Sequence, residues 1–284
     1  MDWYIGNEWT DATRGLHKKV LNLNLQLHCV EKPLAISTLI FTVNKSCANL
    51  GDRPSKYLAN NDESQHEMEM GTAVTPIDCY LELLMQQFIA GETSACSIKT
   101  KSGDTLQFEL KLELIVINTQ IETLKGAELH KLALQYKENG VAMYKTYPKF
   151  AFDYFVRAAK LLITYKPFDK LDSKIEGIEG SELETLFVQV QTNIAACMLQ
   201  EKRYEHVIYH TDFVETQEDP SEKSLYRRAL AYYHMQEFEK AQLTIERVPN
   251  YEKKREFTKL LENIATSWKS SKANYKQVVQ RMFS

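Results

Sequence analysis

Few of the chain's chemically reactive side chains are spaced so that they could act together. His206 and His210 stand four residues apart in a helical stretch, which places both on one face of the helix. A zinc site needs at least three protein ligands, and the sequence offers no third ligand for this pair. We therefore interpret both histidines as surface residues.

Five cysteines are scattered along the chain at spacings that match neither a zinc site nor a disulfide framework. They are Cys29, Cys47, Cys79, Cys96 and Cys197. Cys197 falls on the buried side of a predicted helix and is interpreted as a core residue. The sequence also lacks a glycine-rich phosphate loop, a nucleophile elbow and a pair of catalytic carboxylates. It thus predicts no catalytic residues, no metal and no cofactor.

The composition is that of a globular protein of about two domains. The chain has 284 residues, of which 44% are hydrophobic, and its formal net charge is −3. Such a charge offers no broad positive surface to nucleic acid. The first residues lack the basic and apolar regions of a secretory signal, and no apolar run reaches the roughly 18 residues of a membrane helix. We therefore expect no membrane partner and a location in the cytoplasm, with the nucleus as a second location.

The clearest structural pattern lies in residues 222–249. Leu225 and Ala229 share one face of a predicted helix, and Ala241 begins the buried face of a second helix after a short turn at residues 236–237. This pattern resembles a tetratricopeptide repeat (TPR), in which two helices pack closely at small side chains. The alternative interpretation is an ordinary helical hairpin.

The same pattern occurs twice upstream. One unit places Ala195 and Val207 twelve residues apart, and an earlier unit places Gly140 and Ala151 eleven residues apart. A single unit cannot bury its apolar face alone, and three units are the usual minimum for a stable stack. Residues 252–284 are predicted to form a long helix that closes this stack.

The N-terminal half is predicted to be an antiparallel sheet with one helix. Alternation of apolar and polar residues favours half-buried strands, with every second residue inside from Leu21 to Leu27 and from Leu106 to Leu114. The strands are expected at residues 21–28, 34–43, 67–70, 92–100 and 105–116.

Other N-terminal segments are predicted to connect these strands. Thr75 and Pro76 suit the start of a helix and Gly91 its end. Residues 1–16 are interpreted as a leader that packs partly on a neighbour, and residues 44–66 as a long loop.

Several stretches resemble an FKBP-type immunophilin that carries TPR units. Residues 70–71 and 90–92 resemble the boundaries of the FKBP helix, and residues 105–112 resemble the last FKBP strand. Residues 223–228 resemble the third repeat of the large immunophilins, and residues 275–283 their C-terminal extension.

This resemblance covers nearly the whole chain and implies an α+β protein. We expect an FKBP-like domain of antiparallel sheet and one helix in residues 1–118. An all-α array of three TPR repeats should follow in residues 127–251, with a capping extension helix in residues 252–284.

The resemblance also implies that the isomerase pocket of active FKBPs is degenerate here. The position of the indole floor falls at or next to Leu81, which is aliphatic, and no Phe-Asp pair occurs in residues 44–66. The long loop before the last strand is reduced to residues 101–104 and contains no tyrosine. Phe108 matches an aromatic residue of the last strand, but its first interpretation is a core residue. The resemblance thus implies the FKBP fold but not the isomerase activity.

A second family site is the carboxylate clamp. In TPR domains that hold the acidic tail of the ninety-kilodalton heat-shock chaperone, five polar side chains bind that tail. The match assigns four positions to Lys137, Asn193, Lys223 and Arg227, and the fifth, an asparagine in the family, is Val141 here. Cations would pair with carboxylates and asparagine with the peptide backbone. The alternative interpretation is that the three cations are solvated surface charges.

The first functional hypothesis is a non-catalytic scaffold or co-chaperone in which both domains bind protein. The chain most resembles a noncanonical FKBP that partners a casein-kinase-I-type clock kinase, which implies such a kinase as the client and a role in circadian rhythm. The alternatives are a weakly active, divergent peptidyl-prolyl isomerase and a purely structural TPR adaptor.

Overall fold

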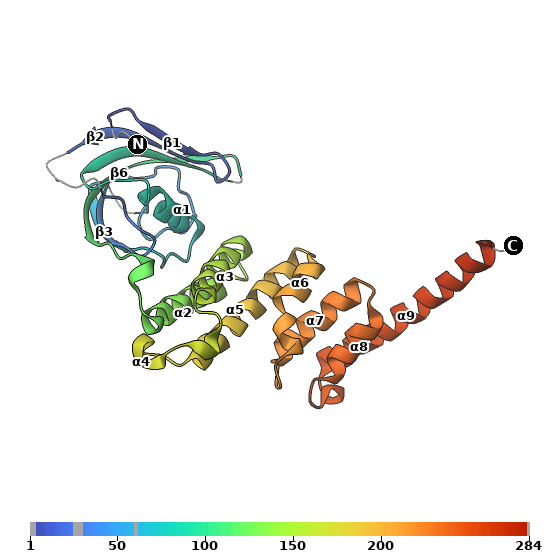
Figure 1. Cartoon of the computed structure of the whole chain (residues 1–284). Coiled ribbons are helices and arrows are strands. Elements are labelled where there is room, and N and C mark those ends of the chain that lie inside the picture. Colours follow the sequence, from blue (N-terminus) through green and yellow to red (C-terminus); the bar gives the residue numbers. More distant parts are fainter. Residues whose placement is uncertain (1–3, 25–30, 60–61, 101, 283–284) are drawn as a thin grey trace. The chain divides into compact units, whose positions relative to one another are not determined.

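Alternating buried and exposed side chains build one antiparallel sheet from the first part of the chain (Figure 1). The computed structural model describes residues 4–24, 31–59, 62–100 and 102–282, with side chains up to residue 273. Its strands are β1 (Glu8–Asp11), β2 (Leu16–Leu23), β3 (Thr38–Lys45), β4 (Ser64–Glu69), β5 (Glu92–Lys99) and β6 (Thr105–Ile117). Their order in the sheet is β1-β2-β5-β6-β3-β4.

Helix α1 (Pro76–Met85) covers the inner face of this sheet. The hydroxyl of Thr75 accepts a hydrogen bond from the backbone amide of Asp78 at 3.3 Å, and Pro76 begins the helix. Both residues act as predicted, because an N-cap hydroxyl satisfies an amide that has no partner within the helix. Leu81 and Leu84 are completely buried in the core between the helix and the sheet.

The alternation predicted for β6 is confirmed along most of the strand and fails at one end. The inward residues from Leu106 to Leu112 are buried, whereas Leu114 is 46% exposed. The pairing of β6 with β3 skips Glu113, because Ile40 lies opposite Leu114 and Phe41 lies opposite Leu112. An extra residue of this kind turns the following side chains to the other face of the sheet.

The N-terminal segment differs more from its prediction. Residues 8–11 are not a leader but the edge strand β1, which pairs with β2, and Trp9 packs against the core. β2 begins at Leu16 rather than at residue 21, and a register shift after Val20 leaves Leu21 exposed. Residues 25–28 of the predicted strand lie outside the described residues.

A buried ion pair explains why β2 extends through charged sequence. Nζ of Lys18 lies 2.5 Å from Oε1 of Glu92 and 2.5 Å from the carbonyl oxygen of Gln87. The amide of Ile89 and the hydroxyl of Ser94 also donate to the Glu92 carboxylate. Burial lowers the pKa of Lys18 despite this carboxylate. The ammonium group is therefore tolerated in the interior because it is paired with a carboxylate and donates a second hydrogen bond to a backbone carbonyl.

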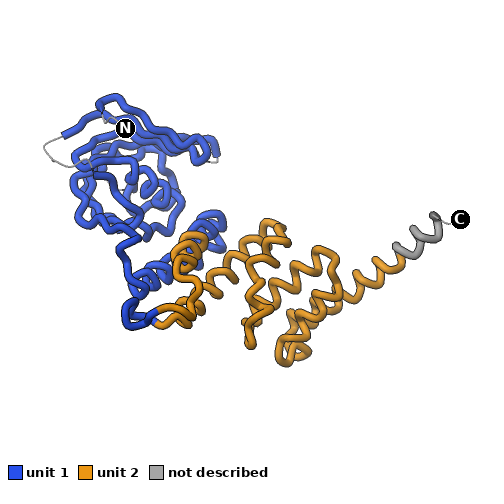
Figure 2. The backbone as a smooth tube through the Cα atoms, viewed as in Figure 1, with its two compact units in different colours: residues 1–154, 172–178 blue, residues 155–171, 179–284 orange. Residues whose placement is uncertain are grey.

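The chain forms two compact units (Figure 2). Unit 1 comprises residues 1–154 and 172–178, and unit 2 comprises residues 155–171 and 179–284. Besides the sheet and α1, unit 1 holds η1 (Ile121–Thr123), α2 (Gly126–Met143), the first residues of α3 (Pro148–Ile163), and α4 (Ser173–Glu176). The predicted domain boundaries at residues 118, 127 and 251 stay predictions.

Within unit 1, residues 71–73 of the sheet domain contact the first helical pair. The hydroxyl of Tyr154 donates to the carbonyl oxygen of Ala73 at 2.7 Å, and the side-chain amide of Asn139 donates to that of Gly71 at 2.9 Å. Gly71 has a φ of +83°, and a Cβ added to it would lie 2.9 Å from the ring of Tyr136. A glycine is required here because the backbone is left-handed and the aromatic ring is so close.

Unit 2 is helical. It contains the rest of α3, η2 (Phe168–Lys170), α5 (Gly180–Gln200), α6 (Tyr204–His210), η3 (Asp212–Glu215), α7 (Glu222–His234), α8 (Phe238–Glu246), η4 (Tyr251–Lys253) and α9 (Arg255–Met282). None of the helices in the described part of the chain combines the length and the apolar character that crossing a bilayer requires.

The small residues that predicted the second and third repeats lie at helix contacts. Ala195 and Val207 are completely buried in α5 and α6, as are Ala229 and Ala241 in α7 and α8. Gln236 takes the left-handed conformation in the turn between α7 and α8, where a turn was predicted. The closing helix is α9, whose residues from Phe257 to Ile264 share a core with α7 and α8.

The four cysteines in the described part of the chain, Cys47, Cys79, Cys96 and Cys197, are buried. Burial raises the pKa of Cys197 to about 12, and it raises the pKa of Cys96 as well. The predicted core position of Cys197 is thus confirmed.

We expect Ala229→Trp to unfold or strongly destabilise the third repeat. Ala229 is completely buried between α7 and α8, and overpacking a filled core costs roughly 1–3 kcal/mol or more. Ala265→Trp is the matched control, because Ala265 is exposed on α9. Thermal melting followed by circular dichroism compares the two variants, and equal melting temperatures would show that the repeat is packed differently.

Candidate protein-binding sites

The two residues expected at a degenerate isomerase pocket lie inside the hydrophobic core. Leu81 of α1 is 0% exposed and Phe108 of β6 is 3% exposed. Tyr57 and Leu58, from the predicted 44–66 loop, are buried in the same core. The Tyr57 ring contacts Phe41 edge-on, with 5.5 Å between the ring centroids. Side chains from the long loop thus contribute to the core that contains Leu81 and Phe108.

Asp78 anchors this inserted segment to the start of α1. Its buried carboxylate accepts hydrogen bonds from the hydroxyl of Ser55 at 2.6 Å and from the backbone amide of Lys56 at 2.9 Å. Burial raises the pKa of Tyr57 to about 12, which keeps the phenol neutral beside these carboxylates. The unusual length of the loop therefore serves to fill the domain interior.

Unit 2 contains three of the four clamp positions. Asn193 lies on α5, and Lys223 and Arg227 lie on α7. The guanidinium of Arg227 donates to the carbonyl oxygen of Thr192, the residue before Asn193, at 2.5 Å. Lys223 is exposed, whereas Arg227 is half-buried and takes part in the contact between the two helices. Arg227 thus has a structural contact in addition to any role in binding.

The remaining clamp positions lie on α2 in unit 1. Lys137 is half-buried, and Val141 is 56% exposed. The valine side chain has no hydrogen-bond donor or acceptor for a peptide. It therefore cannot replace the asparagine that the family has at this position.

The two histidines on α6 have partners other than a metal. Nε2 of His206 lies 2.6 Å from the Arg203 guanidinium, and Nδ1 of His210 lies 2.6 Å from the side-chain oxygen of Gln191. Burial lowers the pKa of His210. Within the described residues, no group of three or more potential ligands could hold a metal ion.

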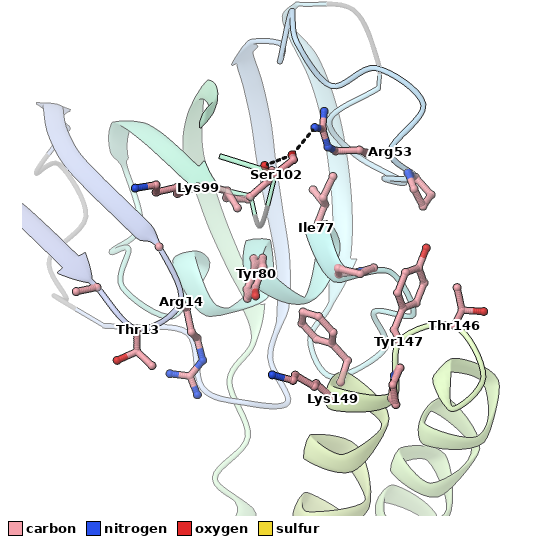
Figure 3. Close-up of a pocket in the computed structure, with 18 residues that line it drawn as sticks. Thr13, Arg14, Arg53, Ile77, Tyr80, Lys99, Ser102, Thr146, Tyr147 and Lys149 are labelled. Atoms are coloured by element: carbon pink, nitrogen blue, oxygen red, sulfur yellow. Dashed lines mark hydrogen bonds between the residues drawn. The ribbon is translucent and has the colours of Figure 1, made fainter. Parts of the chain in front are cut away.

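A cleft of about 690 Å³ in unit 1 was not predicted from the sequence (Figure 3). It lies between the β1–β2 turn, the end of β5, the first turns of α1 and the α2–α3 turn. Tyr80 of α1 and Phe150 of α3 pack edge-on there, with their ring centroids 5.2 Å apart. Burial raises the pKa of Tyr80, so its phenol is neutral. Neither Leu81 nor Phe108 lines this cleft.

Two arginines at the cleft are held by neighbouring aspartates. The guanidinium of Arg14 lies 2.8 Å from the Asp11 carboxylate, and Arg53 pairs with Asp104. Hydrogen bonds from Arg14 hold the pKa of Asp11 below its usual value. The hydroxyl of Ser102 and then Arg53 do the same for the pKa of Asp104. Both carboxylates are therefore charged at neutral pH and keep the arginines at the rim.

Gly15 brings the β1–β2 turn against the end of β5 and so forms one wall of the cleft. Its φ is +68°, and its carbonyl oxygen accepts a hydrogen bond from the amide of Lys99 at 2.7 Å. A Cβ on Gly15 would lie 2.9 Å from Cβ and 3.0 Å from the carbonyl oxygen of Lys99. The wall thus depends on a residue without a side chain.

An FKBP-like sheet domain with a filled interior, joined to TPR helices, defines a class of protein that binds other proteins. A family model of the FKBP-like N-terminal domain of BDBT matches residues 9–117, and a model of the Bride of doubletime-like TPR domain matches residues 125–209. The chain belongs to the Bride of doubletime family.

Individual relatives agree with this assignment. Protein Bride of doubletime of Drosophila melanogaster is 66% identical over 288 residues, an alignment that covers 100% of both chains. A crystal structure of residues 1–211 of CG17282 is 63% identical, covers 73% of this chain and 100% of its own, and matches with a TM-score of 0.67. The α+β fold and the FKBP–TPR organisation are confirmed, and they support a scaffold or adaptor role.

We expect Gly15→Ala to destabilise the protein more than Gly103→Ala. Both glycines have positive φ, so each alanine carries a backbone cost of about 1–2 kcal/mol. Only the alanine at residue 15 also collides with Lys99, because a Cβ on Gly103 would meet no atom within 4 Å. Urea unfolding of the two variants measures the difference, and equal losses of stability would mean that the turn does not pack closely on β5.

Proposed function

We propose that this chain is a non-catalytic scaffold whose FKBP-like domain has no peptidyl-prolyl isomerase activity. The supporting observation is that Leu81 and Phe108 lie in a core filled by Tyr57 and Leu58. A prolyl isomerase must admit a proline side chain to an apolar pocket, and a packed interior offers no such space. The cleft at Tyr80 and Phe150 lacks both pocket positions.

The proposed client is a casein-kinase-I-type kinase. The Drosophila relative is named as the bride of a protein called doubletime, and its similarity extends over the whole of both chains. The TPR helices provide the helical surface on which such scaffolds hold a partner. Through this client the protein would act in circadian rhythm.

A second proposed partner is the acidic tail of the ninety-kilodalton heat-shock chaperone, which would make the protein a co-chaperone. Lys223 is exposed on α7, and the Arg227 contact joins this helix to α5 beside Asn193. Lys137 would supply the fourth polar group. The buried thiols of Cys47, Cys96 and Cys197 suit a reducing compartment, and we propose the cytoplasm with the nucleus as a second location.

We expect the full chain to leave the cis–trans rate of a proline tetrapeptide unchanged. An ordinary FKBP at equal concentration is the positive control in a protease-coupled assay. A rate comparable to that of the ordinary FKBP would contradict the proposal.

We expect Lys223→Glu to weaken binding of a peptide that ends in Met-Glu-Glu-Val-Asp. A hydrogen bond to a charged group contributes roughly 1.5–3 kcal/mol, and reversal of the charge adds repulsion. Lys223 is exposed, so the fold should be unchanged. Arg227→Glu should weaken binding and also lower the melting temperature, because it removes the contact with Thr192.

Val141→Asn should tighten binding of the same peptide, because it adds the missing amide at an exposed position. Calorimetry on the wild type and the three variants measures these effects. If neither the wild type nor Val141→Asn binds the peptide, the clamp does not function and the kinase is the remaining proposed partner.

A further inference from the structure

We propose that the cleft of unit 1 binds an extended acidic segment of a partner protein. A large apolar side chain of this segment would lie against Tyr80 and Phe150, and flanking carboxylates would pair with Lys99 and Lys149. The proposal extends the scaffold function to a site separate from the four clamp positions.

The charges at the cleft favour an anionic occupant. Four of the residues that line it are cations, namely Arg14, Arg53, Lys99 and Lys149, and no carboxylate is among the described residues that line it. The acidic partners of the two arginines, Asp11 and Asp104, are not among the lining residues, and the Asp153 carboxylate also acts on Arg14. The positive charge offered to an occupant therefore comes from the two lysines, although the whole chain has a net charge of −3.

The two lysines differ from the two arginines in having no ion pair with another described residue. Both lysines are exposed, and within the described part of the chain neither has a carboxylate within the 4.0 Å of an ion pair. Lys99 ends β5 and Lys149 lies in the first turn of α3, so both are attached to regular elements of the same unit. They point to carboxylates supplied by another molecule, because ion pairing selects a complementary partner.

The apolar part of the cleft favours a peptide over a small anion. Tyr80, Tyr147 and Phe150 are only half-buried, and Ile77 and three prolines line the same space. Aromatic rings of this kind gain stability when an apolar side chain covers them. Aromatic-lined grooves are also typical sites for extended peptide segments. A free phosphate or sulfate would leave these rings exposed.

The test uses a fluorescein-labelled peptide, Gly-Glu-Glu-Phe-Leu-Glu-Glu-Gly, with an amidated C-terminus. The amide removes the terminal carboxylate that the clamp would recognise, so binding at the two sites is distinguished. A second peptide replaces every glutamate by glutamine, and a third replaces every glutamate by lysine. Fluorescence anisotropy with the full chain measures the dissociation constant of each.

We expect the acidic peptide to bind and the other two to bind at least about tenfold more weakly, because complementary charge selects the partner. The double variant Lys99→Glu/Lys149→Glu should lose at least about tenfold in affinity for the acidic peptide. Phe150→Ala should also weaken binding of this peptide, because it removes an apolar contact with the peptide side chain. The matched control is Lys131→Glu/Lys160→Glu, which makes the same charge change at exposed lysines outside the cleft and should bind normally.

Other results would overturn the proposal. Absence of binding by the acidic peptide, or equal binding of the acidic and glutamine peptides, would show that the cleft does not select carboxylates. An equal loss of affinity in the control variant would place the binding elsewhere. Loss of binding in Lys223→Glu, with normal binding in Lys99→Glu/Lys149→Glu, would assign the peptide to the clamp instead. If only the Met-Glu-Glu-Val-Asp peptide fails to bind, the clamp proposal is wrong and the cleft proposal stands.

Discussion

The hydrogen bond from the Tyr154 hydroxyl to the carbonyl oxygen of Ala73 joins two kinds of structure in one compact unit. The Ala73 carbonyl oxygen is buried and accepts only one other contact within the described part of the chain, a weak one from Sγ of Cys79 at 3.6 Å, so the Tyr154 hydroxyl is its main partner. Gly71 allows the ring of Tyr136 to approach the same backbone segment. The short chain from residue 71 to residue 73 thereby fixes where the α2–α3 turn lies with respect to α1 in unit 1, and this placement creates the cleft.

The interior of the sheet domain is packed with the domain's own side chains. The segment around Tyr57 enters the core, and the buried Asp78 carboxylate holds its backbone through Ser55 and Lys56. A buried carboxylate of this kind is acceptable because several donors satisfy it. An FKBP-like fold with such a core retains its outer surfaces and its junction with the helices as places where a partner could bind.

The sequence predicted best what local spacing controls. The small residues at Ala195 and Ala229 indicated close helix contacts, and Thr75 and Pro76 indicated the start of α1. The sequence did not indicate features that depend on contacts between residues far apart in the chain. The strand through Lys18 looks too polar until Glu92, far along the chain, is known to pair with it. The cleft combines turns near residues 14, 99 and 149, and no local pattern indicates that these turns meet.

The shared walls of the cleft couple ligand binding to the integrity of the junction. Gly15 and Lys99 belong to the sheet domain, whereas Tyr147 lies in the turn between α2 and α3 and Phe150 in the first turn of α3. A ligand that contacts both walls binds only when the two parts are assembled, so by thermodynamic linkage it stabilises that assembly in proportion to its concentration and affinity. The same reciprocity means that whatever strengthens the junction, including a partner on the helices, raises the affinity of the cleft. Residues 71–73 would then determine both the stability of the junction and the affinity of the cleft for its ligand.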